Sequence, residues 1–200
     1  MKENSRKAGR PRTFDADHAL DKAMKVFWEK GYEGSSLPEL TEAMGMNRPS
    51  MYAVFGNKEN LFRLALERYS ATHDPLFNAA LKLPTARAVV EHFLRGNADA
   101  QTEADAPHGC LVINGALACS DDALPIRASL IELRAVSEAR LKERFDQARI
   151  DGDLPADCCP SQMARYVMTV SNGMAVQSAA GASRQQLQEV VDHVLRGWPG

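Results

Sequence analysis

Apolar residues recur with the period of an α-helix along almost the whole chain, and this pattern limits the fold more than any other feature. Strand-like alternation is scarce, and turn residues separate the apolar stretches. The sequence therefore predicts an all-α protein. The expected helices span about 15–31, 36–45, 48–55, 57–73, 85–101, 109–120, 124–150, 160–181 and 183–197.

Residues suited to capping stand at the start of the first four segments. Asp15 is a good N-cap, and Ser36 forms a capping-box pattern with Glu39 three residues later. Asn47 and Asn57 precede the next two segments. Glycines mark the ends of the first three segments, at Gly31, Gly45 and Gly56.

The bulk composition suits a globular protein outside the membrane. The 200 residues are 44% hydrophobic and 25% charged, which is enough apolar material for a sizeable core. No run of about eighteen apolar residues is present, which excludes a membrane span. The basic, polar start does not look like a secretory signal, so we expect a cytoplasmic protein whose four cysteines are thiols.

Positive charge is concentrated at the amino end, although the net charge is −2. Residues 1–12 carry five basic side chains and one acidic one, whereas residues 76–200 hold 12 basic and 15 acidic ones. A local basic patch is what nucleic-acid binding requires. Arg10 and Arg12 lie on an extended arm stiffened by proline, which suits a narrow minor groove. A solvated tail is the alternative interpretation.

Residues 36–55 have the anatomy of a helix-turn-helix, with two short helices, a glycine at the bend and an apolar seam. The second helix of such a unit enters the major groove with its first turn facing base edges. Arg48 can reach the O6 and N7 atoms of guanine, and the short Ser50 side chain can donate or accept. Pro49 and Ala53 suit contact with a thymine methyl group.

Contacts with the DNA backbone are expected beside this helix. Tyr52 and Lys58 are placed for phosphates, and the helix starts at Ser36 and Asn47 offer free amides. A plain helical hairpin is the alternative for a bare pattern of this kind.

The detail of this region resembles the DNA-binding domain of the TetR/AcrR family. The resemblance covers about residues 13–70 and rests on FWEKGYEGSS at 27–36 and LTEAMGMNRPSMYAVFGNKENLF at 40–62. It implies about nine helices, a homodimer built by the last two, and repression that a ligand usually releases. Two recognition helices would then meet successive major grooves of a palindromic double-stranded operator, about 34–36 Å apart.

The resemblance also implies which residues touch DNA. The family's contacts fall on Arg48, Pro49, Ser50, Tyr52 and Ala53, with Lys58 on phosphate. The sequence departs from the family at two positions, because Ala53 and Val54 stand where an aromatic residue and a histidine are often found. The operator sequence therefore does not transfer.

Breaks at 74–75 and 83–84 predict the domain boundary. They divide the chain into a basic arm (1–12), a helix-turn-helix domain (13–73), and a ligand-sensing and dimerisation domain (74–200). An inducer of unknown identity is expected between the helices of the last domain. Its candidate lining residues, each of which also suits ordinary core, are Phe93, Asn97, Cys110, Leu117, Leu133, Tyr166, Val170 and Met174.

Cys110 supports an alternative function, a repressor that senses oxidants or electrophiles through its thiol. A similar Gly-Cys-Leu start to the sixth helix occurs in a subgroup of the family, some members of which look like such sensors. A helix N-terminus favours the thiolate, although a small buried core residue is the plainer interpretation. Cys158 and Cys159 match no zinc pattern and cannot easily bridge each other, so we expect no metal or cofactor.

Two other classes of protein are the alternatives to a DNA-binding regulator. An enzyme is not expected, because the chain has no phosphate-binding glycine loop, ordered Ser-His-Asp set, HExxH or matched carboxylate pair. A helical protein-interaction module is the second class, and salt-sensitive binding to one DNA fragment would exclude it. No role is assigned to the scattered histidines His18, His73, His92 and His193.

Overall fold

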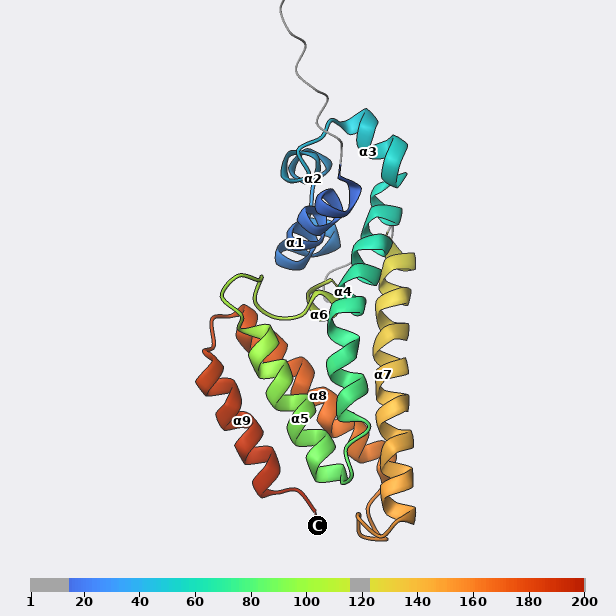
Figure 1. The fold of residues 1–200 in the computed structure, drawn as a ribbon, viewed down its shortest axis with the longest axis vertical. Coiled ribbons are helices and arrows are strands. Elements are labelled where there is room, and N and C mark those ends of the chain that lie inside the picture. The colour runs from blue at the N-terminus through green and yellow to red at the C-terminus, as the bar shows by residue number, and fades with distance from the viewer. Residues whose placement is uncertain (1–14, 116–122, 200) are drawn as a thin grey trace, which may run out of the picture.

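The computed structural model describes residues 15–115 and 123–199, and every regular element within these ranges is a helix. Figure 1 shows α1, α2 and α3 gathered at one end of an elongated molecule, with α4 leading from α3 into the body. The all-α prediction is confirmed. In chain order the helices are α1 (Ala16–Gly34), α2 (Leu37–Ala43), α3 (Arg48–Phe55), α4 (Lys58–Ala80), α5 (Ala86–Gln101), α6 (Leu111–Asn114), α7 (Leu124–Ile150), α8 (Pro160–Ala179) and α9 (Arg184–Arg196).

Side-chain caps fix the starts of the first four helices as the sequence predicts. Asp15, Asn47 and Asn57 each accept a hydrogen bond from the backbone N–H three residues later. Ser36 and Glu39 form a complete capping box at the start of α2. None of the helices in the described ranges is long and apolar enough to cross a membrane.

The first helix differs from its prediction at its carboxyl end. α1 extends to Gly34, but Gly31 interrupts it with non-helical angles (φ 70°, ψ 178°). A side chain is strained at this positive φ, and a Cβ there would lie only 3.3 Å from the carbonyl oxygen of Asn114. Gly31 therefore allows α1 to pass close to α6. Residues 116–122, where the predicted helix 109–120 continues, lie outside the described residues.

The fourth helix is continuous across Pro75, so the break predicted at 74–75 is wrong. A proline inside a helix removes one backbone hydrogen bond and crowds the preceding turn, at a cost of about 3 kcal/mol. The turn that follows carries Phe77 and Ala80, which are both buried in the core of the body. Their burial offsets the cost of the proline. The other predicted helices from α5 to α9, α6 excepted, end within two residues of their predicted bounds.

Two clusters of buried side chains hold the molecule together, and α4 contributes to both. The first cluster joins α1, α2 and α3 to the amino-terminal half of α4, and it includes Leu111 of α6 and Leu130 of α7. The second cluster lies in the body, where Phe77 and Ala80 of α4 pack with α5, α7, α8 and α9. The helix-turn-helix end is therefore not closed by itself, because α6 and α7 complete its core.

Phe62 offers a test of the first cluster. Its ring is fully buried and meets Phe27 and Tyr32 edge to face, with ring centroids 5.0 Å and 5.3 Å away. We expect Phe62→Ala to lower the free energy of unfolding by about 3–5 kcal/mol, measured by urea denaturation. Val136→Ala, at a half-exposed position of α7, should change it by less than about 0.5 kcal/mol. Equal effects of the two changes would contradict this account of the core.

Candidate DNA interface and effector cavity

One face of α3 anchors the helix and the opposite face is exposed. Met51 and Phe55 are buried in the first cluster, and their spacing of four residues puts them on one side of the helix. The residues predicted to touch DNA are all exposed on the remaining surface: Arg48, Pro49, Ser50, Tyr52 and Ala53. The first turn of α3 is thus presented outward from a fixed support.

Arg48 rests along the surface of its own helix. Its Nη2 donates to Tyr52 Oη at 3.4 Å, and the guanidinium carbon lies 5.7 Å from the centroid of that ring. Within residues 15–115 and 123–199 no carboxylate pairs with Arg48. Among the described residues the guanidinium charge has no carboxylate to compensate it, and it is available to an acceptor on another molecule.

The starts of α2 and α3 offer fewer free amides than the sequence alone indicates. In the capping box the Ser36 N–H donates to Glu39, and the Glu39 N–H donates to Ser36 Oγ. The proline at the second position of α2 has no N–H, which leaves the Leu37 amide. At α3 the Asn47 side chain accepts from the Ser50 N–H, and Pro49 has no N–H to offer. The caps and the prolines thus reduce the number of backbone donors at both helix starts.

Contacts at its two flanks hold this unit to α1. The Lys58 ammonium lies 4.4 Å from the centroid of the Tyr32 ring, and burial lowers the pKa of Lys58. On the other flank Lys30 pairs with Glu39. The hydrogen bonds that Glu39 accepts from Lys30 and Ser36 lower the pKa of its carboxyl to about 2. Both the α2 cap and the start of α4 are therefore tied to α1.

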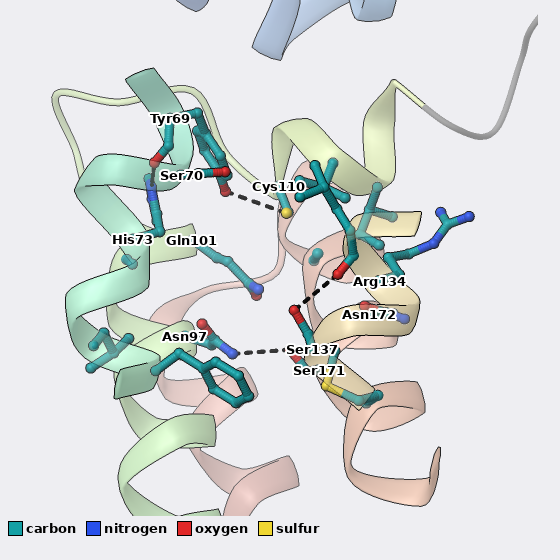
Figure 2. A pocket seen from close by; sticks show the side chains of 18 of the residues that line it. Tyr69, Ser70, His73, Asn97, Gln101, Cys110, Arg134, Ser137, Ser171 and Asn172 are labelled. Atoms are coloured by element: carbon teal, nitrogen blue, oxygen red, sulfur yellow. Dashed lines mark hydrogen bonds between the residues drawn. The ribbon is translucent and has the colours of Figure 1, made fainter. Parts of the chain in front are cut away.

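A cavity of about 150 Å³ lies where α4, α5, α6, α7 and α8 meet. Its wall combines apolar side chains, among them Phe77 and Phe93, with amides and hydroxyls. Figure 2 shows polar side chains from α4 and α5 on one side of this space and from α7 and α8 on the other. In the same view Arg134 points away from it. The cavity interior is therefore lined by uncharged polar groups on an apolar frame.

Tyr69 joins the cavity wall to Cys110 and to α1. Its hydroxyl donates to Cys110 Sγ at 3.3 Å, and its ring stacks on His73 with centroids 3.9 Å apart. Trp28 of α1 meets the same ring edge-on at 4.8 Å. Burial raises the pKa of the Tyr69 phenol, and the neighbouring Cys110 raises it further. The wall of the cavity is thus in direct contact with the DNA-binding end.

Some of the predicted lining residues lie at the cavity and others do not. Phe93, Asn97, Cys110 and Leu133 line the cavity. Tyr166, Val170 and Met174 do not, because α8 turns a different side toward it. That side carries four residues at helical spacing, Met168, Ser171, Asn172 and Ala175. Leu117, Arg10 and Arg12 lie outside the described residues.

Several lining residues were missed by the sequence analysis. His73 was given no role, yet it stands in the wall with Tyr69, one helical turn earlier. Both lie inside the predicted helix 57–73, but the pattern alone does not show which side of that helix faces a cavity. Gln101 and Ser171 were missed because a polar residue on a helix carries no sign of burial. A buried amide at the end of the predicted helix 85–101 is visible only once that helix is packed.

Two of the cysteines lie at helix starts in the structure. Cys110 is the N-cap of α6 and half-buried, without a side-chain capping bond. Cys159 is the N-cap of α8, where hydrogen bonds from the Ser161 hydroxyl and from nearby backbone amides lower the pKa of its thiol. No group of three or more His, Cys, Asp or Glu side chains that could hold a metal occurs in the part of the chain that the structure describes.

Two known protein families match this chain, one in its amino-terminal part and one in its carboxyl-terminal part. Residues 19–65 match the family described as bacterial regulatory proteins, tetR family. Residues 83–194, more than half of the chain, match the tetracyclin repressor-like C-terminal domain. This chain belongs to the TetR family of bacterial regulators. As a TetR-family regulator it is a DNA-binding transcription factor and not an enzyme.

Individual relatives are similar to this TetR-family regulator over most of its length. It is 36% identical over 195 residues to the transcriptional repressor ComR of Escherichia coli K12, covering 96% of this chain and 92% of ComR. It is 30% identical to the repressor AcnR of Corynebacterium glutamicum, covering 94% of each chain. Among solved structures it is similar to a cysteine-substituted CifR, a TetR-family regulator complexed with 26-bp double-strand operator DNA. The identity is 42% and the TM-score 0.89, over 96% of this chain and all of that one.

The buried phenol gives the regulator a measurable response to alkaline pH. Because the pKa of Tyr69 is higher in the folded chain than its usual value of about 10, the unfolded chain loses this proton first. Stability contributed by the neutral phenol is complete below about pH 10 and falls as the pH rises further. The free energy of unfolding should fall more steeply with pH in the wild type than in Tyr69→Phe, by about 1.4 kcal/mol per pH unit. Urea unfolding between pH 9 and 11.5 measures both slopes. Tyr166→Phe, at a half-exposed position, should keep the wild-type slope.

Proposed function

We propose that the regulator represses transcription by binding a palindromic operator as a homodimer, and that a small molecule in the cavity releases it. The observation that carries the proposal is the exposed first turn of α3, with an unpaired guanidinium and two buried anchors behind it. Arg48 leaves Tyr52 and reads a base edge, while Pro49, Ser50 and Ala53 face the neighbouring bases. Backbone contacts come from Tyr52, Lys58 and the helix starts capped by Ser36 and Asn47.

The remaining parts of the chain take complementary roles in this proposal. Arg10 and Arg12 of the basic arm (1–12) enter the adjacent minor groove. Residues 13–73 bind DNA, and residues 74–200 sense the ligand and dimerise. The regulator acts in the cytoplasm, on the nucleoid when bound to DNA.

The last two helices supply the dimer contact. Tyr166 and Val176 of α8 are 48% and 44% exposed, and Val190 of α9 is 42% exposed. Large apolar side chains left exposed on these two helices are available for contact with another molecule. A second copy on this surface would present two α3 helices about 34–36 Å apart, the spacing of successive major grooves.

Helix α4 couples the cavity to the DNA interface. Its first turn carries Lys58 beside α1, and Tyr69, His73 and Phe77 further along it line the cavity. A ligand that favours one position of α4 therefore favours one position of α3. The change in operator affinity equals the difference in ligand affinity between the two arrangements.

Arg48 provides the direct test of base reading. We expect Arg48→Ala to weaken operator binding by about 1–3 kcal/mol and to relax the preference at one base pair, measured by fluorescence anisotropy on operator variants. Arg149→Ala removes the same charge at the end of α7 far from α3 (Figure 1) and should leave both quantities unchanged. An equal loss on every sequence would show that Arg48 contacts phosphate only.

A second candidate signal is favoured by the contact between Tyr69 and Cys110 in the cavity wall. In this alternative, Cys110 Sγ displaces the leaving group of an alkylating electrophile, so that a carbon–sulfur bond replaces the bond to the leaving group. The leaving group departs as an anion, which is iodide for iodoacetamide, and the thiol proton passes to solvent. The adduct would displace the Tyr69 hydroxyl and so disturb the packing on Trp28.

The thiol alternative is tested by substitution. Cys110→Ser should abolish release from the operator by iodoacetamide and keep operator binding in its absence, both followed by gel shift. Cys158→Ser is the matched control, because that cysteine lies in the loop before α8, away from the cavity, and should respond like the wild type. Unchanged release with Cys110→Ser would dismiss the alternative.

A further inference from the structure

The cavity wall contains a buried amide whose oxygen receives no hydrogen bond from the residues that the structure describes. Gln101, the last residue of α5, is 7% exposed. Its backbone is fixed, since its carbonyl oxygen accepts from the Gly109 N–H and from Ser178 Oγ. Its side-chain Oε1 accepts no hydrogen bond from any described residue. Figure 2 shows this side chain reaching from α5 into the cavity.

A second polar group, on the α8 side of the cavity, can donate a hydrogen bond. Ser171 is 6% exposed, and its Oγ accepts from Asn97 Nδ2 at 3.0 Å. Its own hydroxyl hydrogen has no acceptor among residues 15–115 and 123–199. Asn97 and Gln101 lie one helical turn apart on the same face of α5. The cavity thus offers an acceptor at Gln101 and a donor at Ser171.

An unpaired buried polar atom costs about 1–3 kcal/mol, so such groups normally find a partner. A hydroxyl is the smallest group that fits both, because it donates to the Gln101 carbonyl and accepts from a donor such as Ser171. It also suits the Gln101 amide in either orientation of its oxygen and nitrogen.

The placement of charged groups around the cavity favours a neutral ligand. Arg134 points away from the cavity (Figure 2), and Asp74 is exposed at its edge. His73 uses its Nδ1 on the Tyr69 carbonyl oxygen, 2.8 Å away. No buried charged side chain in the described residues lines the interior. A charge placed there without a partner would be strongly unfavourable.

The size and the apolar frame limit the rest of the molecule. The volume is about 150 Å³, close to that of a protein cavity able to hold benzene. Phe77 and Phe93, with ring centroids 4.9 Å apart, form part of the wall. These rings favour a compact apolar body next to the polar pair.

We propose that the cavity binds a neutral molecule of about the size of benzene that carries a hydroxyl group, which hydrogen-bonds to Gln101. This inference rests on the proposed function, since it names the chemical class of the releasing ligand. Gln101 sets the selectivity for the hydroxyl, and the phenylalanine pair binds the apolar body.

The test compares three matched probes by calorimetry on the full chain: benzyl alcohol, toluene and benzoate. Benzyl alcohol should bind at least about fivefold more tightly than toluene, because toluene leaves the Gln101 oxygen unpaired. Benzoate should bind more weakly than either. Gln101→Leu, of similar size, should abolish or reverse the preference for the alcohol. Ser137→Ala is the control for loss of a polar wall group, because the Ser137 hydroxyl already donates to the Leu133 carbonyl oxygen.

Thermal unfolding and binding to operator DNA are measured on each variant as separate readouts. Toluene binding as tightly as benzyl alcohol to the wild type, tightest binding of benzoate, or no binding of any probe would each overturn the inference, whatever the variants do. In each of these three cases, salt-sensitive binding to operator DNA would still support the proposed function as a repressor. Failure of that binding would refute the repressor instead.

Discussion

Helix α4 has to remain helical across Pro75 because its two halves are buried in different cores. Phe62 and its neighbours close the core of the DNA-binding end, and Phe77 belongs to the core of the body. A flexible joint at Pro75 would remove the continuous helix between the two cores and weaken the effect of a ligand in the body on α3. The proline is tolerated because the burial that follows it exceeds the loss of one backbone hydrogen bond. The rigidity of this helix joins the two cores directly, alongside α7, which also contributes side chains to both.

The short α6 segment is the second link between the two ends, and close contacts on both of its sides restrict its movement. Toward α1, Asn114 Nδ2 donates to the carbonyl oxygen of Trp28 at 3.2 Å, and Gly31 permits the close approach. Toward α8, a Cβ on Gly109 would lie 2.9 Å from the carbonyl oxygen of Ala175. A shift of α6 away from the cavity therefore presses on α1. The Tyr69 ring, in contact with Trp28 and Cys110, transmits the same displacement through side chains.

The sequence was most informative where local chemistry alone decides the structure. Helix starts follow from capping residues such as Ser36 and Asn47, and the exposed face of α3 follows from helical spacing around Met51. Pro75 shows the limit of this reasoning, because its local preference was overruled by the burial of a residue two positions later. The cavity shows a second limit. Tyr166 and Met168 are both plausible lining residues on a helix that is apolar on nearly all sides, and only packing against α7 selects between them.

The small cavity also limits how the signal acts. Moving an equilibrium from 1:99 to 99:1 requires a ligand to prefer one arrangement by about 5.5 kcal/mol. Small ligands gain at most about 1.5 kcal/mol per non-hydrogen atom, so a ligand with the six carbons of benzene has at most about 9 kcal/mol of binding energy. It can release the regulator fully only if more than half of that energy is available in one arrangement alone. A DNA-bound form in which this cavity is closed would meet that requirement, because the ligand would then bind the released form alone.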